Sequence, residues 1–318
     1  MPNSWVPGSA GLETRKQAGE TRYPMHRAAD RAKNMRWLLV ALVVGVWLAC
    51  SGSMLARAQG GPPFITDDPG TPGAGNWEIN FGWMGQHTVD GGDYELPDAD
   101  INYGWGDRIQ LKLELPLAAS TDTNHTTVAG LGNSLLGVKW RPFEHHTAGE
   151  AKSDENMDFS WGFYPQAVVD NPTNSVRRGV VPRGPQYYLP TELTWKWGPL
   201  AFNGEVGRWI GNRDMPDQWG RGLIVGHTFS PKFEAYGEVY DLEGIDHPPG
   251  EARQRSVTLD GGLRRDLNRS GKMRLLLMGG RSVHRALAGS GEPNWIAYVG
   301  VQFLVGHDPD EAGAAAEK

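Results

Sequence analysis

The sequence predicts an all-β protein: a transmembrane antiparallel β-barrel of about twelve strands, preceded by a cleavable signal peptide. From residue 76 onward, segments alternate apolar and polar side chains, as in Trp77-Glu78-Ile79-Asn80-Phe81. Alternation with a period of two marks a strand whose two faces meet different surroundings. An export signal precedes these segments, and tryptophans gather near their ends. Together these observations favour a barrel with lipid outside and water inside over a soluble β-sandwich.

The export signal is the apolar run at residues 37–50, WLLVALVVGVWLAC. It is shorter than the roughly 18–20 residues of a spanning helix. Basic residues precede it and Ala56-Arg57-Ala58 follows, so we predict cleavage after Ala58 and a location in the cell outer membrane. The expected division is an extended n-region with the signal peptide (1–58), a periplasmic N-terminal segment (59–75), the transmembrane barrel (76–306) and an acidic, alanine-rich tail (307–318).

The charge of the exported chain excludes some partners. The whole sequence has 31 Lys and Arg against 37 Asp and Glu; eight of the basic and three of the acidic residues precede Gln59, which leaves 23 against 34, a net charge of −11. Nucleic-acid binding is not expected, because a phosphate backbone calls for a basic surface. An acidic barrel favours cations in its lumen. The only cysteine, Cys50, lies before Gln59, so no disulfide or thiol chemistry is expected in the exported chain.

Twelve candidate strands follow from the alternation, and short and long connections alternate between them. Short turns on the periplasmic side and long loops outside are typical of outer-membrane barrels. Tryptophans at two heights predict two aromatic girdles at the membrane interfaces. The inner girdle is Trp77, Trp105, Trp140, Trp195 and Trp197, and the outer girdle is Trp83, Trp209, Trp219 and Trp295. The strands are expected at 76–86, 94–105, 108–117, 130–143, 157–169, 186–196, 200–209, 218–228, 232–240, 255–266, 272–281 and 293–304. The segment at 272–281 is apolar on both faces.

Three stretches, GPPFITDDPGTPGAGNWEIN, INYGWGDRIQLKLELPL and GLGNSLLGVKWRPF, resemble the outer-membrane family named for the meta-cleavage pathway of phenol degradation. The resemblance runs from about Gly61 to Gly306. It implies a barrel that transports small, often hydrophobic or aromatic, compounds. One departure is the C-terminus, because such barrels usually end on an aromatic residue, whereas Phe303 is followed by further residues here.

Asp67 and Asp68 precede the first strand in the motif Thr66-Asp67-Asp68-Pro69. Two adjacent carboxylates have three interpretations: a polar turn, since Asp and Pro favour turns, a cation site, or a plug fixed inside the lumen.

The polar phase of the strands supplies the candidate lumen lining. Carboxylates outnumber basic groups eight to three among these residues, which favours a hydrated passage over a sealed, salt-bridged interior. A barrel of twelve strands lies between filled eight-stranded barrels and open porins of 16 to 18 strands. Both a narrow pore and a plugged one are therefore consistent with the sequence. The candidates are Glu78, Asn80, Asp98, Asp100, Asn102, Lys112, Glu114, Lys139, Glu192, Glu205, Glu234, Tyr236, Glu238 and Arg264.

Four prolines, Pro97, Pro116, Pro165 and Pro190, fall in or at the ends of neighbouring strands near the outer rim. Proline lacks the N–H that the strand ladder needs. The cluster indicates either early strand ends or a lateral opening for a hydrophobic solute.

The predicted function is passive passage of small solutes, with outer-membrane lipids, the solute and the barrel assembly machinery as partners. Neither a cofactor nor a metal site is expected. One alternative is a non-conducting barrel whose loops at 170–185 and 241–254 bind a partner. The other is a lipid hydrolase using Ser282 and His284, but no residue to orient the histidine and no GxSxG motif are evident. The chain is therefore not expected to be an enzyme.

Overall fold

The computed structural model describes residues 61–146, 157–212, 215–245, 255–285 and 293–306. The predicted signal peptide, its cleavage site and the acidic tail lie outside these residues, as does the chain at 147–156. Within the described ranges, no helix has the length and hydropathy to cross a membrane.

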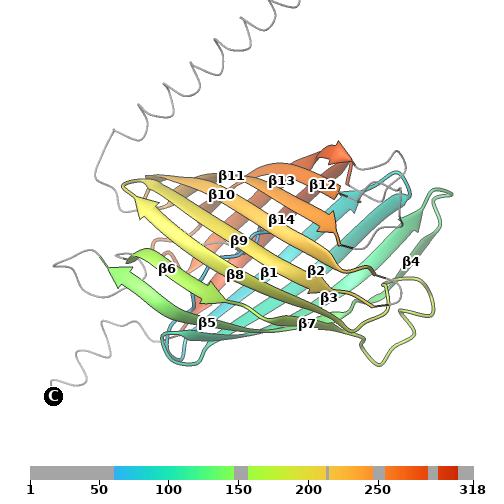
Figure 1. The fold of residues 1–318 in the computed structure, drawn as a ribbon, viewed down its shortest axis with the longest axis horizontal. Coiled ribbons are helices and arrows are strands. Elements are labelled where there is room, and N and C mark those ends of the chain that lie inside the picture. Colours follow the sequence, from blue (N-terminus) through green and yellow to red (C-terminus); the bar gives the residue numbers. More distant parts are fainter. Residues whose placement is uncertain (1–60, 147–156, 213–214, 246–254, 286–292, 307–318) are drawn as a thin grey trace, which may run out of the picture. The chain divides into compact units, whose positions relative to one another are not determined.

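The described chain forms a single β-sheet of fourteen antiparallel segments, drawn from blue to red in Figure 1. The first seven are β1 (Trp77–His87), β2 (Gly91–Gly104), β3 (Ile109–Asp122), β4 (Thr127–Leu131), β5 (Ser134–His146), β6 (Met157–Phe163) and β7 (Gln166–Val169). The others are β8 (Gln186–Trp197), β9 (Leu200–Ile210), β10 (Gln218–Ser230), β11 (Phe233–Gly244), β12 (Arg255–Asp266), β13 (Met273–Arg285) and β14 (Trp295–Val305).

The sheet closes because β1 pairs with β14 along its whole length, from Trp77 opposite Val305 to His87 opposite Trp295. The fourteen segments make twelve strands, since two strands are each interrupted once. β4 and β5 both pair with β3, and β6 and β7 both lie between β5 and β8. This confirms the prediction of a twelve-stranded antiparallel barrel.

Side chains alternate between the two faces of the wall, as the sequence pattern predicts. On β10, for example, Leu223 and Val225 are 49% and 40% exposed, whereas Ile224 between them is fully buried. The exposed face carries aliphatic and aromatic side chains on every side of the barrel, and the buried face carries most of the charged ones. An apolar exterior around a polar interior is the arrangement that a lipid environment requires.

Two expected loops are mostly strand. The chain at 87–93 turns tightly between β1 and β2, where the Thr88 N–H donates to the Gly91 carbonyl at 2.7 Å. The chain at 118–130 extends β3 and adds β4, joined by a turn in which Asp122 Oδ1 accepts from the N–H groups of Asn124 and Thr126. The polar side chains in these two stretches therefore belong to strand ends and not to long loops.

Trp209 is a correction to the predicted outer girdle. It shares the inward face of β9 with Glu205, and its ring stacks on the buried Tyr188 with 4.5 Å between centroids. The height along the strand alone therefore misplaced it. The other tryptophans of the two predicted girdles lie in the outward phase of their strands or in the turns at the strand ends. Trp105 and Trp197 are about two thirds exposed.

Candidate functional site

The segment before β1 lies inside the barrel. The Thr66 N–H donates to Glu238 Oε1 on β11 at 2.6 Å, and the Asp67 N–H donates to Glu205 Oε2 on β9 at 3.0 Å. Arg264 on β12 donates to the carbonyls of Gly61 and Pro62 at 3.2 and 2.9 Å. Glu205, Glu238 and Arg264 are buried on the inward faces of these three strands, so the segment that contacts them lies within the lumen. We call residues 61–72 the lumen segment.

Glycines on the inner wall leave room for this segment. A Cβ on Gly222 of β10 would lie 1.8 Å from Thr66 Oγ1, and one on Gly262 of β12 would lie 3.0 Å from the ring of Phe64. Similarly, a Cβ on Gly162 of β6 would lie 3.2 Å from the Cβ of Pro69. The wall and the segment are therefore sterically fitted to each other.

Lys139 on β5 is the central cation of this contact. Its Nζ lies 2.9 Å from Asp67 Oδ1 and 3.8 Å from Glu192 Oε2, and it also donates to the backbone carbonyl of Asp68. Burial tends to raise the pKa of Asp67, but the attraction of Lys139 and Lys112 holds that pKa below its ordinary value. Burial raises the pKa of Asp68 to about 6, against the opposing charge of Lys139.

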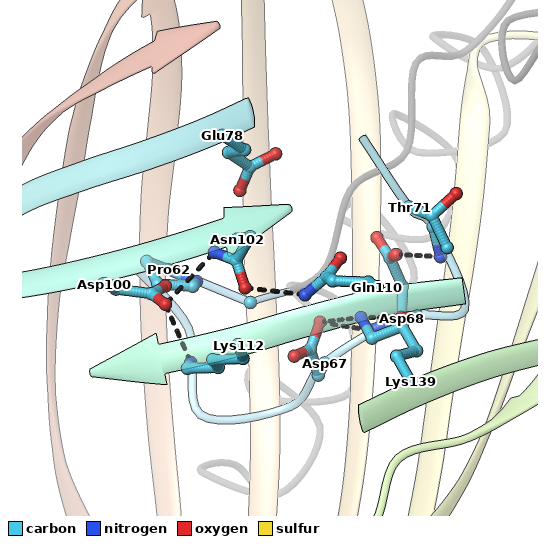
Figure 2. A pocket seen from close by; sticks show the side chains of 12 residues that line it. Pro62, Asp67, Asp68, Thr71, Glu78, Asp100, Asn102, Gln110, Lys112 and Lys139 are labelled. Atoms are coloured by element: carbon cyan, nitrogen blue, oxygen red, sulfur yellow. Dashed lines mark hydrogen bonds and ion pairs between the residues drawn. The ribbon is translucent and has the colours of Figure 1, made fainter. Parts of the chain in front are cut away.

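A hydrogen-bonded network on β1, β2 and β3 continues from this contact, with the lumen segment on one side (Figure 2). Asp100 accepts from Asn80 and from Asn102, each at 3.1 Å. Gln110 donates to Asn102 at 2.7 Å, and Lys112 lies 3.3 Å from Asp100. A small cavity remains between this network and the segment. Most of the residues that line it are polar or charged.

A cluster of buried apolar and aromatic side chains lies on the lumen side of β10, β11, β13 and β14, among charged residues of the same wall such as Glu238 and Arg264. Phe64 of the lumen segment packs against it, with its ring 5.3 Å from that of Tyr236. Met84 of β1 contacts the same cluster. We call this set the apolar lumen patch, and its wall residues are Ile224, Tyr236, Leu276, Met278, Ile296 and Tyr298.

All fourteen candidate lumen residues lie on the inward phase of their strands. Eleven of them are buried, and Glu78, Lys112 and Glu114 are half-buried. The buried ones are Asn80, Asp98, Asp100, Asn102, Lys139, Glu192, Glu205, Glu234, Tyr236, Glu238 and Arg264.

The four prolines lie in a wall whose strands remain paired. The carbonyls of Pro116, Pro165 and Pro190 accept hydrogen bonds from Gly132, Val138 and Tyr164 at 2.8, 3.0 and 3.2 Å. Pro97 lies in a bulge of β2. A lateral opening here would require these pairs to separate, and it stays a prediction.

Sequence reasoning missed three features of the lumen. The apolar patch was hidden because the segment at 272–281 is apolar on both faces, so alternation could not show that Leu276 and Met278 point inward. The contacts of Phe64 with Tyr236, and of Arg264 with the carbonyls of Gly61 and Pro62, join segments that are far apart in the sequence, and no periodicity reveals them. Glu95 also faces the lumen, out of phase with Asp98, Asp100 and Asn102 later in its strand.

These features define the class: a closed, twelve-stranded barrel of the outer-membrane type with an internal segment. No protein-family model matches the chain, and no curated protein sequence matches it. Among solved structures, an outer membrane channel from Pseudomonas putida F1 matches 78% of this chain and all of its own at 11% identity, with a TM-score of 0.54. That likeness establishes a shared fold. The KdgM and NanC porins match 72% and 73% of the chain at 10% and 7% identity, with TM-scores of 0.45 and 0.46, and cover 99% and 100% of their own chains.

Proposed function

We propose that this protein is an outer-membrane channel for passive passage of small solutes, and that its preferred solutes are hydrophobic or aromatic compounds. The observation that carries the proposal is the apolar lumen patch, which lies in an otherwise polar and mostly acidic lumen. An aqueous pore for ions does not need a buried cluster of four aliphatic side chains and two tyrosines on its inner wall. A solute with apolar surface gains roughly 25 cal/mol per Å² by contact with such a set.

The lumen segment is the gate in this proposal. It covers the apolar lumen patch with Phe64 and is bound to the acidic wall through Lys139 and Glu238. A hydrophobic solute would compete with Phe64 for binding to the patch and would thereby favour release of the lumen segment from the wall. The resemblance to the phenol-degradation family and the shared fold with a bacterial outer membrane channel agree with a transport role.

Uptake in a deletion strain tests the solute class. We expect uptake of a labelled monoaromatic compound to fall several-fold on deletion and to be restored by the plasmid-borne gene, while uptake of a labelled disaccharide stays unchanged. A fall in disaccharide uptake with unchanged aromatic uptake would contradict the proposal and favour a plain aqueous pore. Planar-bilayer recording should show small, cation-preferring channels, because lumen carboxylates outnumber basic groups. Clear anion preference would contradict the cation bias.

A hydrolase is a weaker candidate. Ser282 is 2% exposed, lies on the inward face of β13 and is within 3.2 Å of Ser256 Oγ and 3.4 Å of Thr258 Oγ1. A nucleophile needs a base within hydrogen-bond reach, and these neighbours are hydroxyls. The side chain of His284, the base considered from the sequence, lies outside the part of the chain that the structure describes. Adhesion through the loops at 170–185 and 241–254 is the other alternative, and it predicts a barrel without conductance.

A further inference from the structure

A bulge in β2 turns an additional carboxylate into the lumen. β2 carries two residues, Leu96 and Pro97, opposite one residue on each neighbouring strand, so the register shifts between Glu95 and Asp98. Without the bulge these two carboxylates, three residues apart, would face opposite sides of the wall. With it, Leu96 points outward and is 61% exposed, and Glu95 and Asp98 both point inward. Bulges commonly re-aim a side chain in this way.

Glu114 of β3 completes a group of three carboxylates. One oxygen from each of Glu95, Asp98 and Glu114 lies within 4.8 Å of the other two. Lys112 is the nearby cation, but its Nζ lies 3.1 Å from Glu114 and 3.3 Å from Asp100, so it bridges two carboxylates already. We call Glu95, Asp98 and Glu114 the carboxylate triad.

One oxygen of Asp98 lacks a compensating partner in the triad. The side chain of Asp98 is buried, with 7% exposure, and its Oδ1 has no hydrogen-bond partner within the described ranges of the chain. An oxygen of a buried carboxylate is strongly disfavoured unless a hydrogen bond, a proton or a cation compensates it. The triad offers Oδ1 only other carboxylate oxygens. A bound cation would satisfy all three side chains at once.

We propose that the carboxylate triad binds one Ca²⁺ ion in the outer half of the lumen. Ca²⁺ takes oxygen ligands at about 2.3–2.6 Å, so two oxygens on one ion lie at most roughly 5 Å apart. The spread of the triad fits this limit. Ca²⁺ accepts irregular geometry and completes its shell with water, which suits three side chains on two strands that face the lumen. This site goes beyond the proposed function and does not depend on which solute is transported. It departs from the expectation from sequence that the chain holds no metal site.

Isothermal titration of the purified, folded protein with CaCl₂ tests the site, after removal of divalent ions with EDTA and at pH 7.5. We expect one Ca²⁺ per barrel with a Kd on the order of 10⁻⁴ to 10⁻³ M, as in extracellular Ca²⁺ modules. Asp98→Asn and Glu95→Gln should each weaken binding at least ten-fold. Asp93→Asn is the matched control, because it removes the same charge from the same strand at an exposed position outside the triad. It should bind within about three-fold of the unchanged protein.

Heat-modifiable gel mobility verifies that each variant is folded, and Glu95→Gln keeps the test valid if Asp98→Asn does not fold. Ca²⁺ should also raise the unfolding temperature of the unchanged protein and not that of Glu95→Gln. Absence of binding up to 10 mM CaCl₂ would overturn the proposal and leave protonation as the way in which Asp98 is compensated. Equal loss of binding in Asp93→Asn would overturn it as well, because the effect would then be general electrostatics.

Discussion

Lys139 Nζ lies 2.9 Å from Asp67 Oδ1 in the interior of the barrel, and this ion pair joins the lumen segment to the wall. The side chain of Lys139 is only 3% exposed. The same Nζ donates to the Asp68 carbonyl and faces the buried Glu192. A single wall cation thus compensates a carboxylate of the segment, a backbone carbonyl and a carboxylate of the wall.

Lys139→Met is expected to release the lumen segment. Removing one member of a buried ion pair costs about 3–5 kcal/mol, because the remaining charges are left uncompensated. Single-channel conductance should rise above that of the unchanged protein. Lys232→Met, at an exposed turn, should leave it unchanged. A second measurement is maleimide labelling of Thr66→Cys in a Cys50→Ser background. Thr66 is fully buried while the segment is bound to the wall, so release of the segment should increase labelling. Unaltered conductance together with unaltered protection of the reporter would contradict the prediction.

Gly222→Ala tests the same contact without changing any charge. The new Cβ would meet Thr66 Oγ1 at 1.8 Å and Thr66 Cβ at 2.8 Å, so the segment must shift away from β10. Conductance should rise, as for Lys139→Met. Gly237→Ala on β11 is the matched control, because its Cβ would have nothing within 4 Å. If both variants behave alike, the segment is not held against β10.

The raised pKa of Asp68 predicts that binding of the lumen segment to the wall depends on pH. We call the bound form the seated state. The pKa of Asp68 is about 6 in the seated state, against an ordinary value of 3.8, so the seated state holds the proton more tightly than the released state does. Lowering the pH from 7 to 5 should therefore favour the seated state and reduce conductance. Asp68→Asn should reduce this pH dependence, and Asp122→Asn, at an exposed turn, should retain it. An increase in conductance on acidification that depends on Asp68 would refute the assignment.

Alternation predicted the twelve strands and the inward phase of residues such as Glu205 and Asp100, because one side chain per two residues is a geometric property of any strand. It could not predict Glu95, since a bulge reverses the phase and leaves no mark in the pattern. Trp209 was misplaced because its height along the strand suggested a girdle, although its phase relative to Glu205 indicated the lumen. The position of the lumen segment depends on hydrogen bonds from the N–H groups of Thr66 and Asp67 to Glu238 and Glu205 of the wall. Such contacts are set by the closed fold and have no local signature.

Leu223→Arg tests whether the exposed face meets lipid. Leu223 lies near the middle of β10 on that face. A charge at the bilayer midplane costs about 2–4 kcal/mol, falling to about 0–1 kcal/mol near an interface. Ile210→Arg, at the outer end of β9, supplies the interfacial control. Urea titrations of folding into phospholipid vesicles should give a larger loss for Leu223→Arg. Equal losses at the two positions would mean that this face does not cross a bilayer.

Leu276→Asn tests the apolar lumen patch as the path of hydrophobic solutes. Leu276 is fully buried on the inner face of β13 and belongs to the cluster that receives Phe64. A polar amide at this place removes apolar surface from the patch and lowers the affinity for an apolar solute. Uptake of a labelled aromatic compound by whole cells should fall several-fold, and disaccharide uptake should stay unchanged. Leu276→Met, which conserves volume and hydrophobicity, should retain aromatic uptake. If the asparagine variant instead changes the uptake of both solutes equally, the patch serves only as the seat of Phe64, and hydrophobic solutes take another route.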